Sequence, residues 1–141
     1  MKQFVYIVFL LLSLHVSAQT EKNYGIQFYH GTWKEACDKA KAENKLIFVD
    51  FYTQWCGPCL NMAENVFILP FIGDFYNTNF VNMKIDAENG EGVELAKRYG
   101  VNSYPTYVFV DPKNGDVVHR SKSRQEAEQF LATGKSALVP E

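Results

Sequence analysis

Two cysteines, Cys56 and Cys59, stand two residues apart with Gly57 and Pro58 between them. They follow an apolar run at 46–52 and precede a stretch with helical character. A cysteine at the start of a helix meets unpaired N–H groups and the positive end of the helix dipole, which favour the thiolate. A thiolate beside a second thiol is the minimum that thiol–disulfide exchange requires. The pair therefore predicts a redox-active site.

Metal binding is the main structural alternative for this pair. A zinc site needs about four ligands, and the other candidates, Cys37, His30 and His119, lack ligand spacing. Cys37 falls on the apolar face of a predicted helix, where a core position is expected. Residues 111–116 contain two aspartates but are too short for a calcium loop, so a solvated turn is expected. We expect no metal ion, and exchange between thiols needs no organic cofactor.

Asp50 interrupts the apolar run that precedes the cysteines. A carboxylate buried in such a strand should have a raised pKa. It could then take the proton from Cys59 as that thiol attacks, directly or through a water molecule. The alternative is a surface-facing or hydrogen-bonded aspartate with a purely structural role.

Hydrophobic periodicity and turn signals predict one domain with a central sheet. The expected helices are 33–43, 57–67, 71–77, 91–99 and 124–131. The expected strands are 46–52, 80–86, 106–110 and 117–120, after a lead-in at 21–29 that could form a short edge strand. Thr32 and Ser123 are expected to cap the first and last helices. This order predicts an α/β fold with helices on both faces of a mixed sheet, parallel in its first half and antiparallel in its second.

Residues 1–18 differ in kind from the rest of the chain. A short basic start is followed by an apolar run at 4–12 and a small-residue pattern at 16–18. This pattern predicts a secretory signal peptide, with 19–141 as the mature domain. The alternatives are an uncleaved anchor or a buried helix, but the run is shorter than the roughly 20 residues of a spanning helix. Export, which we expect to be to the bacterial periplasm, would place the cysteines where disulfides persist.

Composition excludes some classes of partner. The 141 residues are 47% apolar and 21% charged, and the net charge is −2. No long run of one sign occurs, so neither a nucleic-acid footprint nor a polybasic membrane patch is expected.

The sequence resembles the thioredoxin family from about residue 33 to residue 131. The residues that carry this resemblance are Val49-Asp50-Phe51, Trp55-Cys56-Gly57-Pro58-Cys59, Ile85-Asp86 and Tyr99-Gly100-Val101-Asn102-Ser103-Tyr104-Pro105-Thr106. Further stretches, including Lys45-Leu46-Ile47 and Val66-Phe67, look like exported members related to the C-terminal domain of the transmembrane thiol:disulfide interchange protein. The resemblance implies the thioredoxin fold.

The resemblance also implies roles for the residues at the redox pair. Cys56 would be the nucleophile, Cys59 the resolving thiol and Asp50 the group that moves the proton. Gly57 and Pro58 would form part of the substrate-binding surface, and a neutral Gly-Pro pair is similar to the reducing members of the family.

Three more residues would complete the substrate site by resemblance. Pro105 would be cis and pack against the cysteines, and the backbone of Tyr104 would hold an extended segment of substrate. Trp55 would cover the site, the alternative being a simple core aromatic. The family often has a lysine where this chain has Asn82, and Lys84, with the same strand parity, is the expected substitute.

These features together predict an exported disulfide reductase. Its partners would be protein disulfides and a membrane thiol that donates electrons, and the protein is expected to be a monomer. One alternative is an exported disulfide oxidase or isomerase with the same residues. Another is a non-catalytic binding module that uses the groove beside the cis proline.

Overall fold

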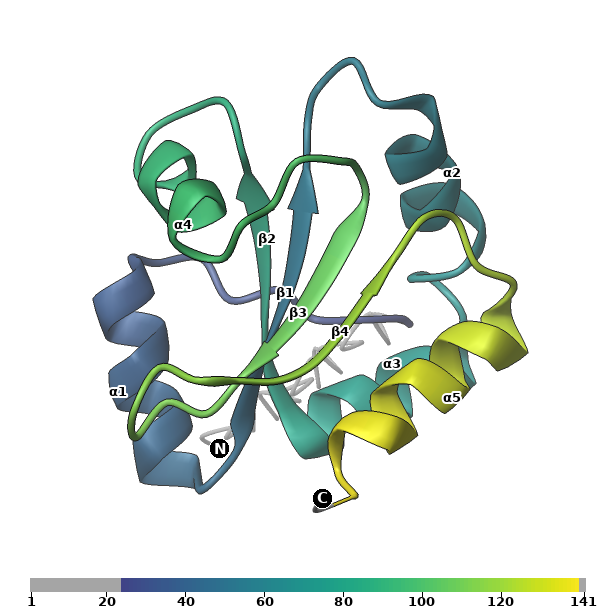
Figure 1. Cartoon of the computed structure of the whole chain (residues 1–141). Helices are drawn as coiled ribbons and strands as arrows, with labels where there is room; N and C mark the ends of the chain where they lie inside the picture. The colour runs from purple at the N-terminus through teal and green to yellow at the C-terminus, as the bar shows by residue number, and fades with distance from the viewer. Residues whose placement is uncertain (1–23, 140–141) are drawn as a thin grey trace, which may run out of the picture.

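The computed structural model describes residues 24–139, so the expected signal segment, 1–18, lies outside the described residues. Four strands form one sheet in the order β2-β1-β3-β4 (Figure 1). They are β1 (Leu46–Tyr52), β2 (Phe80–Asp86), β3 (Thr106–Val110) and β4 (Val117–Lys122). β1 pairs in parallel with β2 and antiparallel with β3, and β3 pairs antiparallel with β4. The expected mixed sheet is confirmed.

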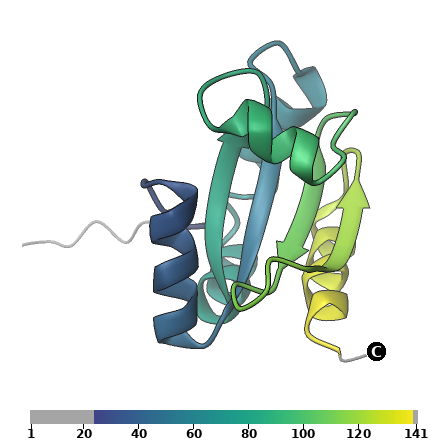
Figure 2. The same ribbon diagram turned by 60° about the vertical axis from the view of Figure 1, so that its left-hand side comes forward.

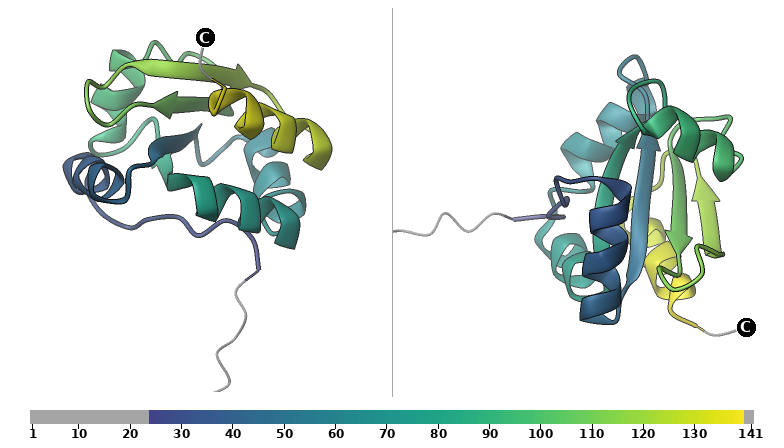
Figure 3. Two further views of the ribbon diagram at one scale, coloured as in Figure 1. Left: turned by 90° about the horizontal axis from the view of Figure 1, so that it is seen from below. Right: turned by 90° about the vertical axis from the view of Figure 1, so that its left-hand side faces the viewer.

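Helices cover both faces of this sheet, as expected for the α/β class (Figures 2 and 3). The described residues form α1 (Trp33–Glu43), α2 (Gly57–Asn65), α3 (Pro70–Asn79), α4 (Gly92–Arg98) and α5 (Ala127–Ala137). One core cluster joins the sheet to α1 and α4, and the other joins it to α2, α3 and α5. No helix in this part of the chain has the length and apolar character to cross a bilayer.

The central strand β1 is buried on both faces, which explains its nearly continuous apolar sequence. Ile47 and Val49 belong to the core under α1 and α4, whereas Phe48 belongs to the core under α2, α3 and α5. This second core is aromatic, and the rings of Tyr76 and Phe130 stack with centroids 4.6 Å apart. Each such side chain stabilises the fold by about 1.5–3 kcal/mol through burial. A rigid core therefore holds the C-terminal end of β1, from which the cysteine loop leaves.

Helix α1 begins as its sequence predicts. Thr32 accepts a hydrogen bond from the Glu35 N–H, and the Glu35 carboxylate accepts one from the Thr32 N–H, which completes a capping box. The helix after the cysteines ends two residues earlier than expected, at Asn65, and Pro70 starts the following helix instead of only preceding it.

The last helix begins later than expected, so the prediction that Ser123 caps it is wrong. Ser123 has a φ of 72°, and its N–H donates to the carbonyl of Pro105 over 2.9 Å. This bond prolongs the pairing of β4 with β3, and α5 starts only after Glu126, which makes no side-chain capping bond. The described part of the lead-in, residues 24–29, is also less regular than a strand, since it pairs with β2 through the isolated parallel bridge between Phe28 and Asn82.

Candidate active site

A disulfide between Cys56 and Cys59 lies at the N-terminus of α2. Cys56 is the N-cap residue, and its Sγ accepts a hydrogen bond from the Cys59 N–H over 3.2 Å. Pro58 occupies the first turn, where its missing N–H costs no helical hydrogen bond. When the disulfide is reduced, this N–H and the helix dipole are placed to stabilise a thiolate on Cys56. The structure thus gives the pair the local environment that the sequence predicted.

A cavity of about 230 Å³ opens beside the disulfide. Trp55, Cys56, Gly57 and Cys59 line it, together with Lys84 from β2. Pro58 is exposed but lies outside this lining. Both cysteines are buried, at 6% and 3% exposure, and the cavity and the exposed Gly57 and Pro58 lie directly beside them.

Trp55 is 70% exposed, which rules out the alternative that it is a simple core aromatic. Its ring meets the ring of Tyr104 edge to face, with centroids 5.9 Å apart. The Tyr104-Pro105 peptide bond is cis, as the resemblance implied. Tyr104 therefore contacts Trp55, the residue next to Cys56. Pro105 is buried and does not line the cavity.

Asp50 is buried, at 1% exposure, so the surface-facing alternative is wrong. Its Oδ2 lies 2.9 Å from Lys84 Nζ, and its Oδ1 is buried with no hydrogen-bond partner. Burial raises the pKa of the Asp50 carboxyl, and the Lys84 ammonium opposes this only in part. A carboxylate with a raised pKa is a better proton acceptor than an ordinary aspartate.

Lys84 connects this carboxylate to the cavity beside the cysteines. Its ammonium lies 4.3 Å from the ring centroid of Tyr52, and the rings of Phe67 and Phe28 lie 5.6 and 6.0 Å away. Aromatic faces stabilise a cation in such positions. Lys84 was expected to take the place of the lysine that the family often has at position 82, and its contact with Asp50 confirms this.

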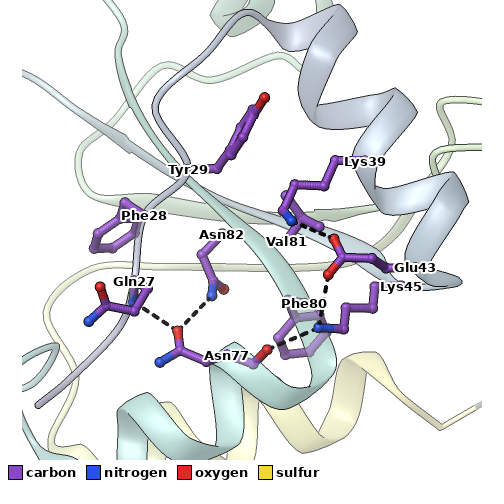
Figure 4. A pocket seen from close by; sticks show the side chains of 10 residues that line it. All are labelled: Gln27, Phe28, Tyr29, Lys39, Glu43, Lys45, Asn77, Phe80, Val81 and Asn82. Atoms are coloured by element: carbon purple, nitrogen blue, oxygen red, sulfur yellow. Dashed lines mark hydrogen bonds and ion pairs between the residues drawn. The ribbon is translucent and has the colours of Figure 1, made fainter. Parts of the chain in front are cut away.

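Asn82, at the usual position of that lysine, has a different set of contacts. The parallel register places Lys84 beside Asp50 and Asn82 beside Phe48. The Asn82 Nδ2 donates to Asn77 Oδ1 over 3.2 Å, and Asn82 lines a separate pocket at the edge of the sheet (Figure 4). Asn82 therefore stabilises the junction of β2, α3 and the lead-in and does not contact Asp50.

Sequence reasoning missed Glu88, which lies in the loop after β2. Its Oε1 accepts a hydrogen bond of 2.6 Å from the Trp55 indole N–H. The nearby Asp86 accepts a further bond from the Gln54 side chain over 3.1 Å. The chain offered no motif for these contacts, because they join loops that are more than thirty residues apart.

The residues considered for metal binding do not assemble. Cys37 is a free thiol, half-buried against the core under α1, and burial raises its pKa. His119 packs on the ring of Phe109. Residues 24–139 contain no group of three or more His, Cys, Asp or Glu side chains arranged to hold a metal ion.

Residues 33–138 match the family model described as a thioredoxin-like domain, and the chain belongs to this family. The chain keeps a Cys-x-x-Cys disulfide, which is consistent with the thiol–disulfide oxidoreductase class that the sequence resemblance implied.

Individual relatives agree with this assignment. Thioredoxin-1 of Drosophila yakuba is 46% identical over 69 residues, which are 49% of this chain and 60% of that protein, so the chain spans three fifths of this relative's length. A proposed disulphide-isomerase from Bacteroides thetaiotaomicron has a similar structure, with a TM-score of 0.74, 42% identity and coverage of 85% of this chain and 98% of that one. The reduced C-terminal domain of Neisseria meningitidis DsbD has a TM-score of 0.61 and 25% identity, covering 74% and 92% of the two chains.

Proposed function

We propose that this protein reduces the disulfides of other proteins by dithiol exchange. The observation that supports this direction is the environment of the Cys56 sulfur. It accepts its hydrogen bond from the Cys59 N–H, and Gly57 and Pro58 place no charge between the cysteines. The strongly oxidising enzymes of this kind owe their potential to a stabilised reduced form. Here the hydrogen bond to the Cys56 sulfur comes from the end of a helix, and no charged residue lies between the cysteines, so the dithiol should give up its electrons readily.

The reaction would proceed in two exchange steps. The Cys56 thiolate attacks one sulfur of the substrate disulfide, forms a mixed disulfide and expels the other substrate sulfur as a thiolate, which takes a proton from solvent. The Cys59 thiol then attacks Cys56 Sγ and loses its proton to Asp50. The Cys56–Cys59 disulfide forms and the second substrate sulfur leaves as a thiolate, which takes a proton from solvent, so two electrons pass to the substrate.

The reduction potential of the Cys56–Cys59 pair tests this direction. We expect a value near that of thioredoxin, about −270 mV, in equilibrium with a glutathione buffer. An isomerase is the second candidate, because the Bacteroides thetaiotaomicron neighbour carries that proposed activity. A measured potential between about −180 and −120 mV, the range of isomerases and oxidases, would reject the reductase. A Cys56 that stays unreactive toward iodoacetamide at neutral pH would instead favour a binding module.

We also propose that the protein works outside the cytoplasm, in the bacterial periplasm, and receives electrons from a membrane thiol. The apolar segment at 4–12 and the small residues at 16–18 support export. Similarity to the DsbD domain supports a membrane-linked donor. Acid quenching of cells followed by thiol alkylation should find the pair reduced in the periplasmic fraction and oxidised after loss of the donor. A pair that stays reduced without any membrane thiol donor would contradict this part of the proposal.

A further inference from the structure

Trp55 connects three loops around the disulfide. It directly precedes Cys56, its indole N–H donates to Glu88 over 2.6 Å, and its ring contacts Tyr104. These residues come from the loops after β1, after β2 and before β3, which lie at the same end of the sheet (Figure 1). A side chain that is 70% exposed would normally sample several rotamers. The Glu88 hydrogen bond and the Tyr104 contact hold it in one position.

The loop that carries Glu88 is itself fixed to the cysteine loop. The Ala87 N–H donates to the carbonyl of Tyr52 over 2.9 Å. The Asp86 carboxylate accepts from the Glu88 N–H over 2.9 Å and from Gln54 over 3.1 Å. These bonds therefore hold the Glu88 carboxylate at the rim of the redox site.

The loops around this rim are predominantly acidic, although Lys84 lines the cavity and Arg124 donates a hydrogen bond to Asn61 of α2. The segments 53–69, 86–96 and 100–107 surround the site and contain no lysine or arginine. Their acidic residues are Glu64, Asp86, Glu88, Glu91 and Glu94. Within residues 24–139, none of these five forms an ion pair, and Lys84 is already paired with Asp50. A local excess of charge of one sign steers partners of the opposite sign toward a site.

We infer that Glu88 is a positioning and specificity-determining residue. It holds Trp55 beside the cavity at the disulfide and selects substrate disulfides that are flanked by basic residues. This inference rests on the proposed exchange of protein disulfides. Cationic side chains beside the substrate disulfide would meet the Glu88 carboxylate as the disulfide reaches Cys56. Glutamine at position 88 has no charge but could still accept the indole hydrogen bond. Alanine has no charge and could not accept this bond.

The test uses three peptides of equal length, each with one internal disulfide flanked by lysine, serine or glutamate pairs. The wild-type protein should reduce the lysine peptide about tenfold faster in kcat/KM than the glutamate peptide at low ionic strength. Salt at about 0.5 M should remove most of this difference. Glu88→Gln should lose most of the preference, measured as the ratio of kcat/KM on the lysine peptide to kcat/KM on the glutamate peptide. Glu64→Gln removes the same charge from α2 without touching Trp55, and should keep the preference.

Glu88→Ala separates the positioning role from the charge. It should lower kcat/KM on the serine peptide as well, and increase acrylamide quenching of Trp55 fluorescence in a Trp33→Phe background. Equal rates on all three peptides, or an unchanged preference in Glu88→Gln, would overturn the inference while leaving the reductase intact. Failure to reduce any peptide would reject the reductase, and the inference would then require the same lysine preference in oxidation of the dithiol peptides.

Discussion

A Cys59→Ser variant is expected to remain covalently joined to its disulfide substrates. Cys56 keeps its place at the N-terminus of α2 and can still attack, but no thiol remains to resolve the mixed disulfide. Multiple turnover should be abolished. The substitution is nearly isosteric at a site that is 3% exposed, so the fold should persist. Non-reducing gels and intact-mass spectrometry of the variant after incubation with oxidised insulin would show the adduct.

Two matched variants identify the sulfur that forms the adduct. Cys56→Ser should form no adduct, since the serine hydroxyl at the helix N-terminus is not a thiolate. Cys37→Ser combined with Cys59→Ser should trap as well as Cys59→Ser alone, because Cys37 packs on the other side of the sheet from α2. If the Cys56 and Cys59 variants both kept wild-type insulin reduction, exchange through this pair would be the wrong mechanism.

Replacing Asp50 with asparagine is expected to slow the release of substrate from the mixed disulfide and to stabilise the fold at neutral pH. Asparagine cannot accept the proton of Cys59, so the resolving step should slow by on the order of 10–100-fold, at or below the usual contribution of a general base. Stopped-flow measurement of a single turnover would separate this step from the first attack. An unchanged resolving rate between pH 6 and 8 would exclude Asp50 from proton transfer.

The stability effect follows from the raised pKa of Asp50. Burial makes the carboxyl harder to ionise in the folded protein than in the unfolded chain. As pH rises above the ordinary aspartate pKa of about 3.9, Asp50 loses its proton in the unfolded chain before it does so in the folded protein. The free energy of unfolding therefore falls with pH until the pKa of Asp50 in the folded protein is passed. The asparagine side chain of the variant does not titrate, so Asp50→Asn should become more stable relative to wild type over this range. Urea titrations at several pH values would measure the difference.

Lys84→Met provides the control for both effects. Without the ammonium that lowers it, the pKa of Asp50 should rise further. The resolving rate should then reach its plateau at a higher pH than in wild type, whereas Asp50→Asn should show no such titration. The same pH profile in Lys84→Met and in wild type would mean that the ion pair does not tune Asp50.

Much of the fold could be predicted because its strands are covered by helices and therefore have simple apolar patterns. The limits of β1, β2 and β3 agree with the sequence, since each is bounded by turn or capping residues. The start of α5 could not be predicted in the same way. Ser123 has the local signature of a helix cap, but its N–H is bonded to the carbonyl of Pro105, which is distant in sequence, directly after the end of β4. Tertiary pairing decided that boundary.

The candidate site shows the same division. The disulfide and the buried Asp50 agree with expectations drawn from the residues around the cysteines, and the cis bond before Pro105 agrees with what the family resemblance implied. Glu88 could not be found, because its role depends on where the loop after β2 passes the indole of Trp55. A residue in a surface loop has no periodic pattern that would predict its contacts. The folded structure is needed to show which other loop it faces.

The pairing of Asp50 with Lys84 has a consequence for tracing this site in other chains. A lysine two residues further along a strand is displaced by about 6.6 Å, yet it stays on the same face. The acid can thus keep a basic partner when the motif position itself is lost, provided that the partner stands alongside in the parallel register. An alignment by motif would indicate that the basic partner of Asp50 is absent, because Asn82 occupies its usual position. The strand register instead identifies Lys84 as that partner. In this chain the acid and its base are related by facing positions on neighbouring strands and not by their spacing along one strand.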